Sequence, residues 1–262
     1  MKGSDPSRKG VRPLAERGQT PSGKGSDPVL WHDLECGAYR ADLPLWRELA
    51  ALSGGPILDV GAGTGRVALD LARRGHEVVA LDRDSDLLAA LERRAEGLPV
   101  RTVLADAREI DLPDRFALIL VPMQTIQLLE GRADRLALLR GAAAHLAPDG
   151  RFAAALADAL EGFDIEHDQP PVPDVLERDG WVYISQPLRV VLGDGAVTIE
   201  RERSAVSPTG QWTTAPDRIR LEDLGAAALE AEGAEADLNP AGRRRIAPTA
   251  DHVGSQVVIL RD

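Results

Sequence analysis

The chain has 262 residues, a net charge of −11 and one cysteine, Cys36. This length can bury one full α/β core, a single cysteine excludes an internal disulfide and any metal site built on several cysteines, and the acidic balance argues against nucleic acid as a partner. Because no apolar run approaches a membrane span and no signal sequence follows Met1, we expect a cytoplasmic protein without a membrane partner. These features leave the oligomeric state open.

The first 28 residues differ in composition from the rest of the chain. They hold all three lysines, are rich in glycine, serine and proline, and show no apolar periodicity. The pentapeptide Lys-Gly-Ser-Asp-Pro occurs at 2–6 and again at 24–28. We therefore expect 1–28 to be a disordered N-terminal extension, either native or a tag, in front of one folded domain over 29–262.

Residues 31–52 carry leucines at helical spacing and predict helix, with Pro44 starting a second helix. Beyond them, short apolar runs alternate with amphipathic stretches. We expect strands at 56–60, 77–81, 100–104, 116–121 and 152–157, and helices at 66–74, 85–96 and 132–146. Strands that alternate with helices in this way predict an α/β fold with a doubly wound, mostly parallel sheet and right-handed crossovers.

The pattern changes after residue 158. An acidic, proline-rich stretch at 161–180 precedes a predicted hairpin, whose strands at 181–191 and 196–206 flank the turn Gly193-Asp194-Gly195. A further strand up to residue 220, a helix at 223–232 and strands at 244–246 and 256–260 complete the chain. We interpret 159–220 as an antiparallel insertion that covers the active-site edge of a seven-stranded sheet.

The strand at 56–60 runs into Gly61, Gly63 and Gly65, and then into a helix. Glycine permits positive φ and lets a ligand approach the bare backbone, while the helix N-terminus offers free N–H groups and a partial positive charge. The pattern differs from the dinucleotide fingerprint G-x-G-x-x-G because Arg66 stands where the last glycine belongs. The turn therefore predicts a nucleotide-like ligand other than a dinucleotide.

Two carboxylates follow the next two predicted strands. Asp82 stands at the end of the second strand, 21 residues after Gly61. A carboxylate there can accept hydrogen bonds from both ribose hydroxyls of a nucleoside. The neighbouring Asp84 is the expected N-cap of the following helix. Asp106 follows the third strand, and in this register we interpret it as a ligand-binding residue rather than a turn residue.

The motif Asp59-x-Gly61-x-Gly63-x-Gly65, with Asp82 and Asp106 in order behind it, resembles the class I S-adenosylmethionine (SAM)-dependent methyltransferases of the small-molecule type. The resemblance spans about residues 31–160 and 221–262. It implies a Rossmann-like fold, SAM as cofactor, S-adenosylhomocysteine (SAH) as product, the ribose on Asp82 and the adenine amino group on Asp106. The cofactor-binding residues it implies are Tyr39, Asp59, Gly61, Ala62, Gly63, Asp82, Arg83, Asp106, Ala107, Val121, Pro122 and Gln127.

The segment 121–127, after the fourth predicted strand, indicates the acceptor class by what it lacks. It has neither the Asn/Asp-Pro-Pro-aromatic tetrad of the nucleic-acid amino-methyltransferases nor the carboxylate of the magnesium-dependent catechol type. We therefore expect no base flipping, no nucleic acid and no metal, and predict methyl transfer to N or O of a small-molecule acceptor. Arginine-rich, lysine-poor usage is typical of high-GC genomes, where such enzymes are common in secondary metabolism, so a secondary metabolite is one candidate acceptor.

The sequence assigns no general base. Tyr39, Asp158 and His167 are the candidates near the expected mouth of the site, and no Ser/His/Asp spacing indicates acyl transfer. Two alternatives stay open at this point. One is a nicotinamide-dependent oxidoreductase, which Arg66 and the glycine spacing disfavour. The other is a non-catalytic nucleotide-binding protein, which the missing base leaves possible.

Overall fold

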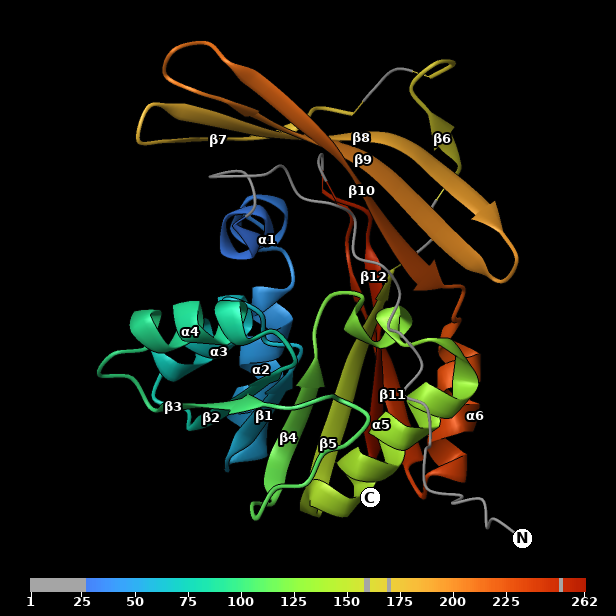
Figure 1. The fold of residues 1–262 in the computed structure, drawn as a ribbon. Helices are drawn as coiled ribbons and strands as arrows, with labels where there is room; N and C mark the ends of the chain where they lie inside the picture. Colours follow the sequence, from blue (N-terminus) through green and yellow to red (C-terminus); the bar gives the residue numbers. More distant parts are fainter. Residues whose placement is uncertain (1–26, 158–160, 169–170, 250–251) are drawn as a thin grey trace, which may run out of the picture.

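A seven-stranded sheet forms the centre of the computed structural model, which describes residues 27–157, 161–168, 171–249 and 252–262 (Figure 1). The strand order is β11-β12-β5-β4-β1-β2-β3. The strands are β1 (Ile57–Val60), β2 (Val78–Asp82), β3 (Val100–Leu104), β4 (Phe116–Val121), β5 (Leu146–Ala157), β11 (Asn239–Ile246) and β12 (Ser255–Arg261). β1 to β5 pair in parallel, whereas β12 is antiparallel to both β5 and β11, so the predicted mostly parallel sheet is confirmed.

Helices cover both faces of this sheet, as a doubly wound fold requires. They are α2 (Leu43–Ser53), α3 (Arg66–Ala72), α4 (Ser85–Arg94), α5 (Gly131–His145) and α6 (Ala226–Glu235). One apolar cluster joins one sheet face to Trp46 of α2, Leu71 of α3 and Leu91 of α4. A second cluster joins the other face to Leu139 of α5 and Leu229 of α6. No helix of the described residues is long and apolar enough to cross a membrane.

A second, antiparallel sheet lies across the edge at which β4 and β5 end (Figure 1). Its strands are β6 (Phe163–Asp164), β7 (Asp174–Arg178), β8 (Trp181–Gly193), β9 (Ala196–Val206) and β10 (Trp212–Glu222). The predicted hairpin is β8–β9, and its turn residues Asp194 and Gly195 both have positive φ. This sheet confirms the predicted antiparallel insertion over the active-site edge.

Several boundaries differ from the prediction; β5, for example, begins at Leu146 rather than Phe152. The two helices predicted over 31–52 are α1 (Pro28–Cys36) and α2, but α1 begins at Pro28, inside the last residues of the expected N-terminal extension. The stretch at 161–180 contains β6 and β7, and the prolines between these two strands, with the many acidic residues, hide the strand pattern. β11 begins at Asn239 rather than Arg244, because pairing with the buried β12 extends a strand that is itself almost wholly exposed. The rest of the predicted extension, residues 1–26, lies outside the described residues.

Candidate active site

The glycine turn after β1 requires glycine at all three positions. Gly61, Gly63 and Gly65 have φ values of +73°, +55° and +93°, a region that side chains strongly disfavour. A Cβ atom at Gly61 would lie 2.5 Å from Cγ2 of Thr125, and one at Gly65 would lie 2.2 Å from Cδ1 of Leu91. The backbone of Gly61 donates to the carbonyl of Leu81 at 2.8 Å, which holds the turn against the end of β2.

Asp82 lies directly beside this turn. Its Oδ2 accepts the backbone N–H of Gly63 at 2.8 Å, and its Oδ1 accepts the N–H of Asp84 at 2.9 Å. Asp84 in turn caps α4 through its own side chain, as predicted. The carboxylate of Asp82 is therefore held at the carboxyl ends of β1 and β2, with Arg83 as its neighbour in the chain, where open α/β sheets bind nucleotides.

Asp106 follows β3 and is held by one arginine. Arg108 donates from Nε and from its backbone N–H to Oδ1 of Asp106, both at 2.9 Å, and from Nη2 to Oδ2 at 2.7 Å. These hydrogen bonds keep the pKa of Asp106 below its usual value, although partial burial opposes them. Arg108 is itself anchored to Asp134 of α5 at 2.9 Å. Asp106 and the adjacent Ala107 are therefore rigidly placed at the same sheet edge.

Asp59 lies within β1 and is buried below the turn. Neither of its carboxylate oxygens has a hydrogen bond of good geometry, and burial raises its pKa to about 7, which the charge of Arg66 only partly opposes. A buried carboxylate without strong partners is costly to ionise. Its position under the glycines indicates a role in the shape or charge of the turn.

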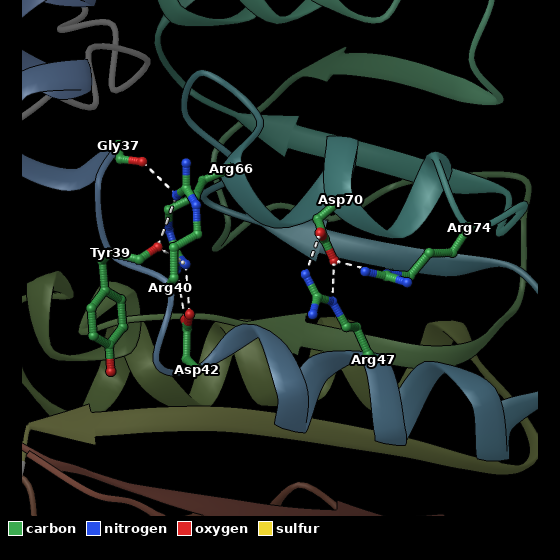
Figure 2. A network of polar contacts seen from close by, with 8 residues as sticks. All are labelled: Gly37, Tyr39, Arg40, Asp42, Arg47, Arg66, Asp70 and Arg74. Atoms are coloured by element: carbon green, nitrogen blue, oxygen red, sulfur yellow. Dashed lines mark hydrogen bonds and ion pairs between the residues drawn. The ribbon is translucent and has the colours of Figure 1, made fainter.

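Arg66, which disfavours a dinucleotide site, has a second role that sequence reasoning missed (Figure 2). It donates two hydrogen bonds of 2.6 Å to Asp42 and one of 3.1 Å to the carbonyl of Tyr39. Asp42 also accepts the indole N–H of Trp46 at 2.8 Å. Both charged groups are buried, so this pair fixes the start of α2 against the start of α3, just behind Gly65.

Tyr39 lies in the segment between α1 and α2 and is almost fully buried. Its ring packs edge-on against His252 with the centroids 4.8 Å apart, and the guanidinium of Arg66 lies 5.2 Å from the ring centroid. Burial, with the charge of Asp42, raises the pKa of the phenol, so it stays protonated at neutral pH. Tyr39 can therefore shape a binding site, and at neutral pH it cannot serve as a base without a partner that removes its proton.

Helix α1 stands between the glycine turn and the antiparallel sheet (Figure 1). Toward the turn, Asp33 binds both Thr64 and Arg94. Toward the antiparallel sheet, Glu35 accepts two 2.7 Å hydrogen bonds from Arg203 of β9. Trp31 packs edge-on against Tyr183 of β8 at 5.9 Å. Sequence reasoning missed these acidic contacts because their partners are distant in the chain.

The loop after β4 contains Val121, Pro122 and a 3₁₀ turn, η2 (Thr125–Leu128). The side chain of Gln127 is buried and bonded at both ends: Nε2 donates to the carbonyl of Glu222 at 3.0 Å, and Oε1 accepts the N–H of Ala157 at 2.7 Å. In this structure Gln127 joins the two sheets through their backbones, and its contact with the cofactor stays a prediction.

Of the other two candidate bases, only His167 lies within the described residues, and it is not at the turn. Asp158 lies outside the described residues. His167 lies after β6 with 77% of its side chain exposed, 4.0 Å from Asp164. With Glu166, these two residues form a group of possible metal ligands whose atoms lie within 4.8 Å of one another, but the group sits on the exposed surface of the insertion.

Comparison with known proteins agrees with this geometry. A family described as a methyltransferase domain matches residues 57–150. The chain is 31% identical over 214 residues to the cypemycin N-terminal methyltransferase of a Streptomyces species, a match that covers 75% of this chain and 85% of that protein. A match over 75% of the chain is longer than residues 1–150, so it must extend into the segment that carries the antiparallel sheet.

Solved structures share the fold over nearly the whole chain. The CcbJ methyltransferase from Streptomyces caelestis is 22% identical with a TM-score of 0.68, over 90% of this chain and 96% of that one. The sugar N-methyltransferase KedS8 from Streptoalloteichus sp ATCC 53650 is 19% identical with a TM-score of 0.69, over 100% and 99%.

The residues at the turn fit SAM. Gly61 and Gly63 carry no side chains of their own, although Thr125 and the ring of His32 lie close to them, and Asp82 presents next to Gly63 a fixed carboxylate that can accept hydrogen bonds from ribose hydroxyls. Neither the oxidoreductase nor the non-catalytic alternative finds support in the comparisons. The glycine turn, the carboxylates behind it and the likeness over most of the chain agree, and the protein belongs to the class I SAM-dependent methyltransferases.

Proposed function

We propose that the protein transfers the methyl group of SAM to an amino nitrogen of a small acceptor, such as the amino terminus of a peptide. The observation that carries this proposal is the 31% identity, over 85% of its length, to a protein named as an N-terminal methyltransferase. That match reaches beyond the cofactor half of the fold into the antiparallel sheet. At least part of the segment that carries the antiparallel sheet is therefore included in the similarity.

Within the cofactor half, we assign the ribose to Asp82, the adenine amino group to Asp106, and the amino-acid part of SAM to the turn at Gly61 and Gly63. Two observations support this assignment. Both carboxylates stand at the carboxyl ends of neighbouring strands, and both are held in place, Asp82 by backbone N–H groups and Asp106 by Arg108. Carboxylates that are already held in place lose no side-chain freedom when they accept hydrogen bonds from a ligand.

We place the methyl acceptor against the face of the antiparallel sheet that contacts helix α1. Arg201 and Arg203 of β9 and Asp217 of β10 share this face with Glu35 of α1, because all four are joined by ion pairs. Asp217 stands out among them. Its Oδ1 binds Arg203 at 3.0 Å, whereas its buried Oδ2 has no hydrogen bond and lies 3.8 Å from Nε of Arg201.

SAM supplies an electrophilic methyl group on a sulfonium centre, and the nitrogen must offer a free electron pair, so a bound ammonium group has to lose a proton. We assign Asp217 to hold the acceptor amine and to accept that proton. Burial raises the pKa of its carboxyl group, with the neighbouring charge of Glu35 in the same direction and that of Arg203 opposed. The rest of the chain contributes by holding nitrogen and methyl group in line, which lowers the entropic barrier.

The test uses methyl-labelled SAM and three acceptors: a short peptide with a free amino terminus, its N-acetylated form, and a phenol. Label should enter only the first. Asp217→Asn should lower kcat/KM for the peptide by at least about tenfold with SAH affinity unchanged, while the control Asp223→Asn, an exposed residue just after β10, should leave both unchanged. Equal labelling of the free and acetylated peptides, or label in the phenol alone, would remove the proposal.

A further inference from the structure

His32 of α1 covers the glycine turn. A Cβ atom built on Gly63 would lie 2.3 Å from Nε2 of His32, so this ring nitrogen rests directly above the Cα of Gly63. The other ring nitrogen, Nδ1, lies 3.2 Å from the hydroxyl of Thr64. That hydroxyl donates its proton to Oδ1 of Asp33 at 2.8 Å, and Arg94 fixes Asp33 from the other side.

This chain of contacts determines the tautomer of His32. Asp33 is an ionised carboxylate, because hydrogen bonds from Arg94 and Thr64 hold its pKa below the usual value against the effect of burial. It therefore only accepts hydrogen bonds. The single proton of the Thr64 hydroxyl is committed to Asp33, so Thr64 must accept from an Nδ1–H of His32. The neutral ring then carries its lone pair on Nε2, above Gly63.

A second hydrogen-bond acceptor, the carboxylate of Asp82, also lies beside Gly63. Oδ2 of Asp82 accepts the N–H of Gly63 at 2.8 Å, so the carboxylate lies beside the residue that His32 covers. The two acceptors come from different elements, β2 and α1, and meet at one glycine. A pair of neighbouring acceptors matches a pair of neighbouring hydroxyl donors, which is what a ribose offers.

We propose that His32 is a cofactor-binding residue, whose Nε2 accepts a hydrogen bond from one ribose hydroxyl of SAM while Asp82 accepts from the other. The proposal rests on the assignment of Asp82 to the ribose made above. It makes α1 part of the cofactor site through a direct polar contact. It also predicts that SAM binding requires the neutral form of His32.

The charges around His32 set the pH at which this contact is lost. Asp33 and Glu35 of α1 and Asp82 of β2 favour the protonated ring, whereas Arg66 of α3 disfavours it. Burial outweighs them and lowers the pKa of His32 below 6.5. Because a protonated Nε2 cannot accept a hydrogen bond, affinity for the cofactor should be full at neutral pH and should fall as the pH drops through that lowered pKa.

The experiment measures dissociation constants by calorimetry for SAH and for 5′-methylthioadenosine, which has the ribose but no amino-acid part. His32→Phe should weaken both ligands by about tenfold. His32→Gln, which keeps an uncharged acceptor, should recover most of the loss. As the pH is lowered from neutral through the pKa of His32, the natural protein should lose affinity, while His32→Phe should not. His76→Phe, at the partly exposed loop before β2, is the matched histidine control.

The binding of SAH and of 5′-methylthioadenosine by the variants distinguishes a ribose contact from other roles of His32. Unchanged binding by His32→Phe, or a loss confined to SAH, would overturn the ribose contact. If His32→Phe does not fold, as judged by circular dichroism, the Gln variant and the pH profile of the natural protein decide instead. Asp82→Asn is measured in parallel: no effect of that variant means that the ribose assignment itself fails, whereas an effect at Asp82 without one at His32 refutes only the present proposal.

Discussion

Replacing Asp42 by alanine should destabilise the protein severely, because it leaves a buried charge unpaired. Arg66 keeps only 7% of its side chain exposed and would retain one hydrogen bond, to a backbone carbonyl. The buried indole N–H of Trp46 would lose its acceptor as well. Breaking a buried ion pair from one side costs about 3–5 kcal/mol, a large part of a typical total of about 5–15 kcal/mol. The melting temperature should therefore fall by roughly 6–20 °C.

Urea unfolding without ligand measures the effect, and three further variants test its cause: Arg66→Met alone, its combination with Asp42→Ala, and Asp70→Ala. Asp42→Ala combined with Arg66→Met removes both charges, so the double variant should be more stable than the sum of the single losses by about 1–3 kcal/mol. Asp70→Ala breaks the neighbouring pair with Arg47, which joins the same two helices but is partly exposed, together with a weaker contact to Arg74, and should cost much less than Asp42→Ala (Figure 2). Additive losses, or equal losses for Asp42→Ala and Asp70→Ala, would refute the reasoning.

Two other predictions concern the turn and α1. Gly61→Ala should weaken SAH binding by at least about tenfold, because it combines positive φ with a clash against Thr125. Gly75 also has positive φ, but a Cβ atom there meets no atom within 4 Å, so the control Gly75→Ala should lower stability without weakening SAH binding. Equal SAH affinities of the two variants by calorimetry would contradict this prediction. Burial by itself would raise the pKa of Glu35, yet Arg203 and Arg201 hold it below 4.5, so its stabilising contribution is present above pH 4.5 and is lost on further acidification. As the pH is lowered, the urea midpoint should therefore fall less steeply in Glu35→Gln than in the natural protein. If the midpoints of the two proteins fall in parallel, the ion pairs of Glu35 do not contribute this stability.

The cofactor half of the fold could be predicted because its signals are local. The turn at Gly61 is specified by residues next to one another, and the cap at Asp84 by a single side chain and the helix that follows it. β1, β2 and β4 are short apolar runs, since a parallel strand inside the sheet is buried on both faces, whereas the edge strand β3 is only partly buried. The hairpin β8–β9 could be predicted equally well, because its turn residues favour positive φ within a two-residue loop.

The contacts that complete the site could not be predicted, because they join residues far apart in the chain. Glu35 meets Arg203 across 168 positions, and Arg66 meets Asp42 across 24. In the sequence each is one charged residue among many, and only the packing of α1 and α2 selects its partner. Gln127 illustrates the same limit: its position at the sheet edge was apparent, while its bonds to Ala157 and Glu222 depend on where the insertion returns to the sheet.

Helix α1 brings these observations together, because neighbouring side chains on it serve different parts of the molecule. Trp31 and Glu35, one helical turn apart, contact Tyr183 and Arg203 of the antiparallel sheet. The residue after Trp31 covers the glycine turn, and the next one binds Thr64 and Arg94. A helix held on both sides cannot move away from the turn without straining its contacts with the antiparallel sheet. The glycine turn and the antiparallel sheet are therefore joined through one short helix, whose residues 31–35 contact both.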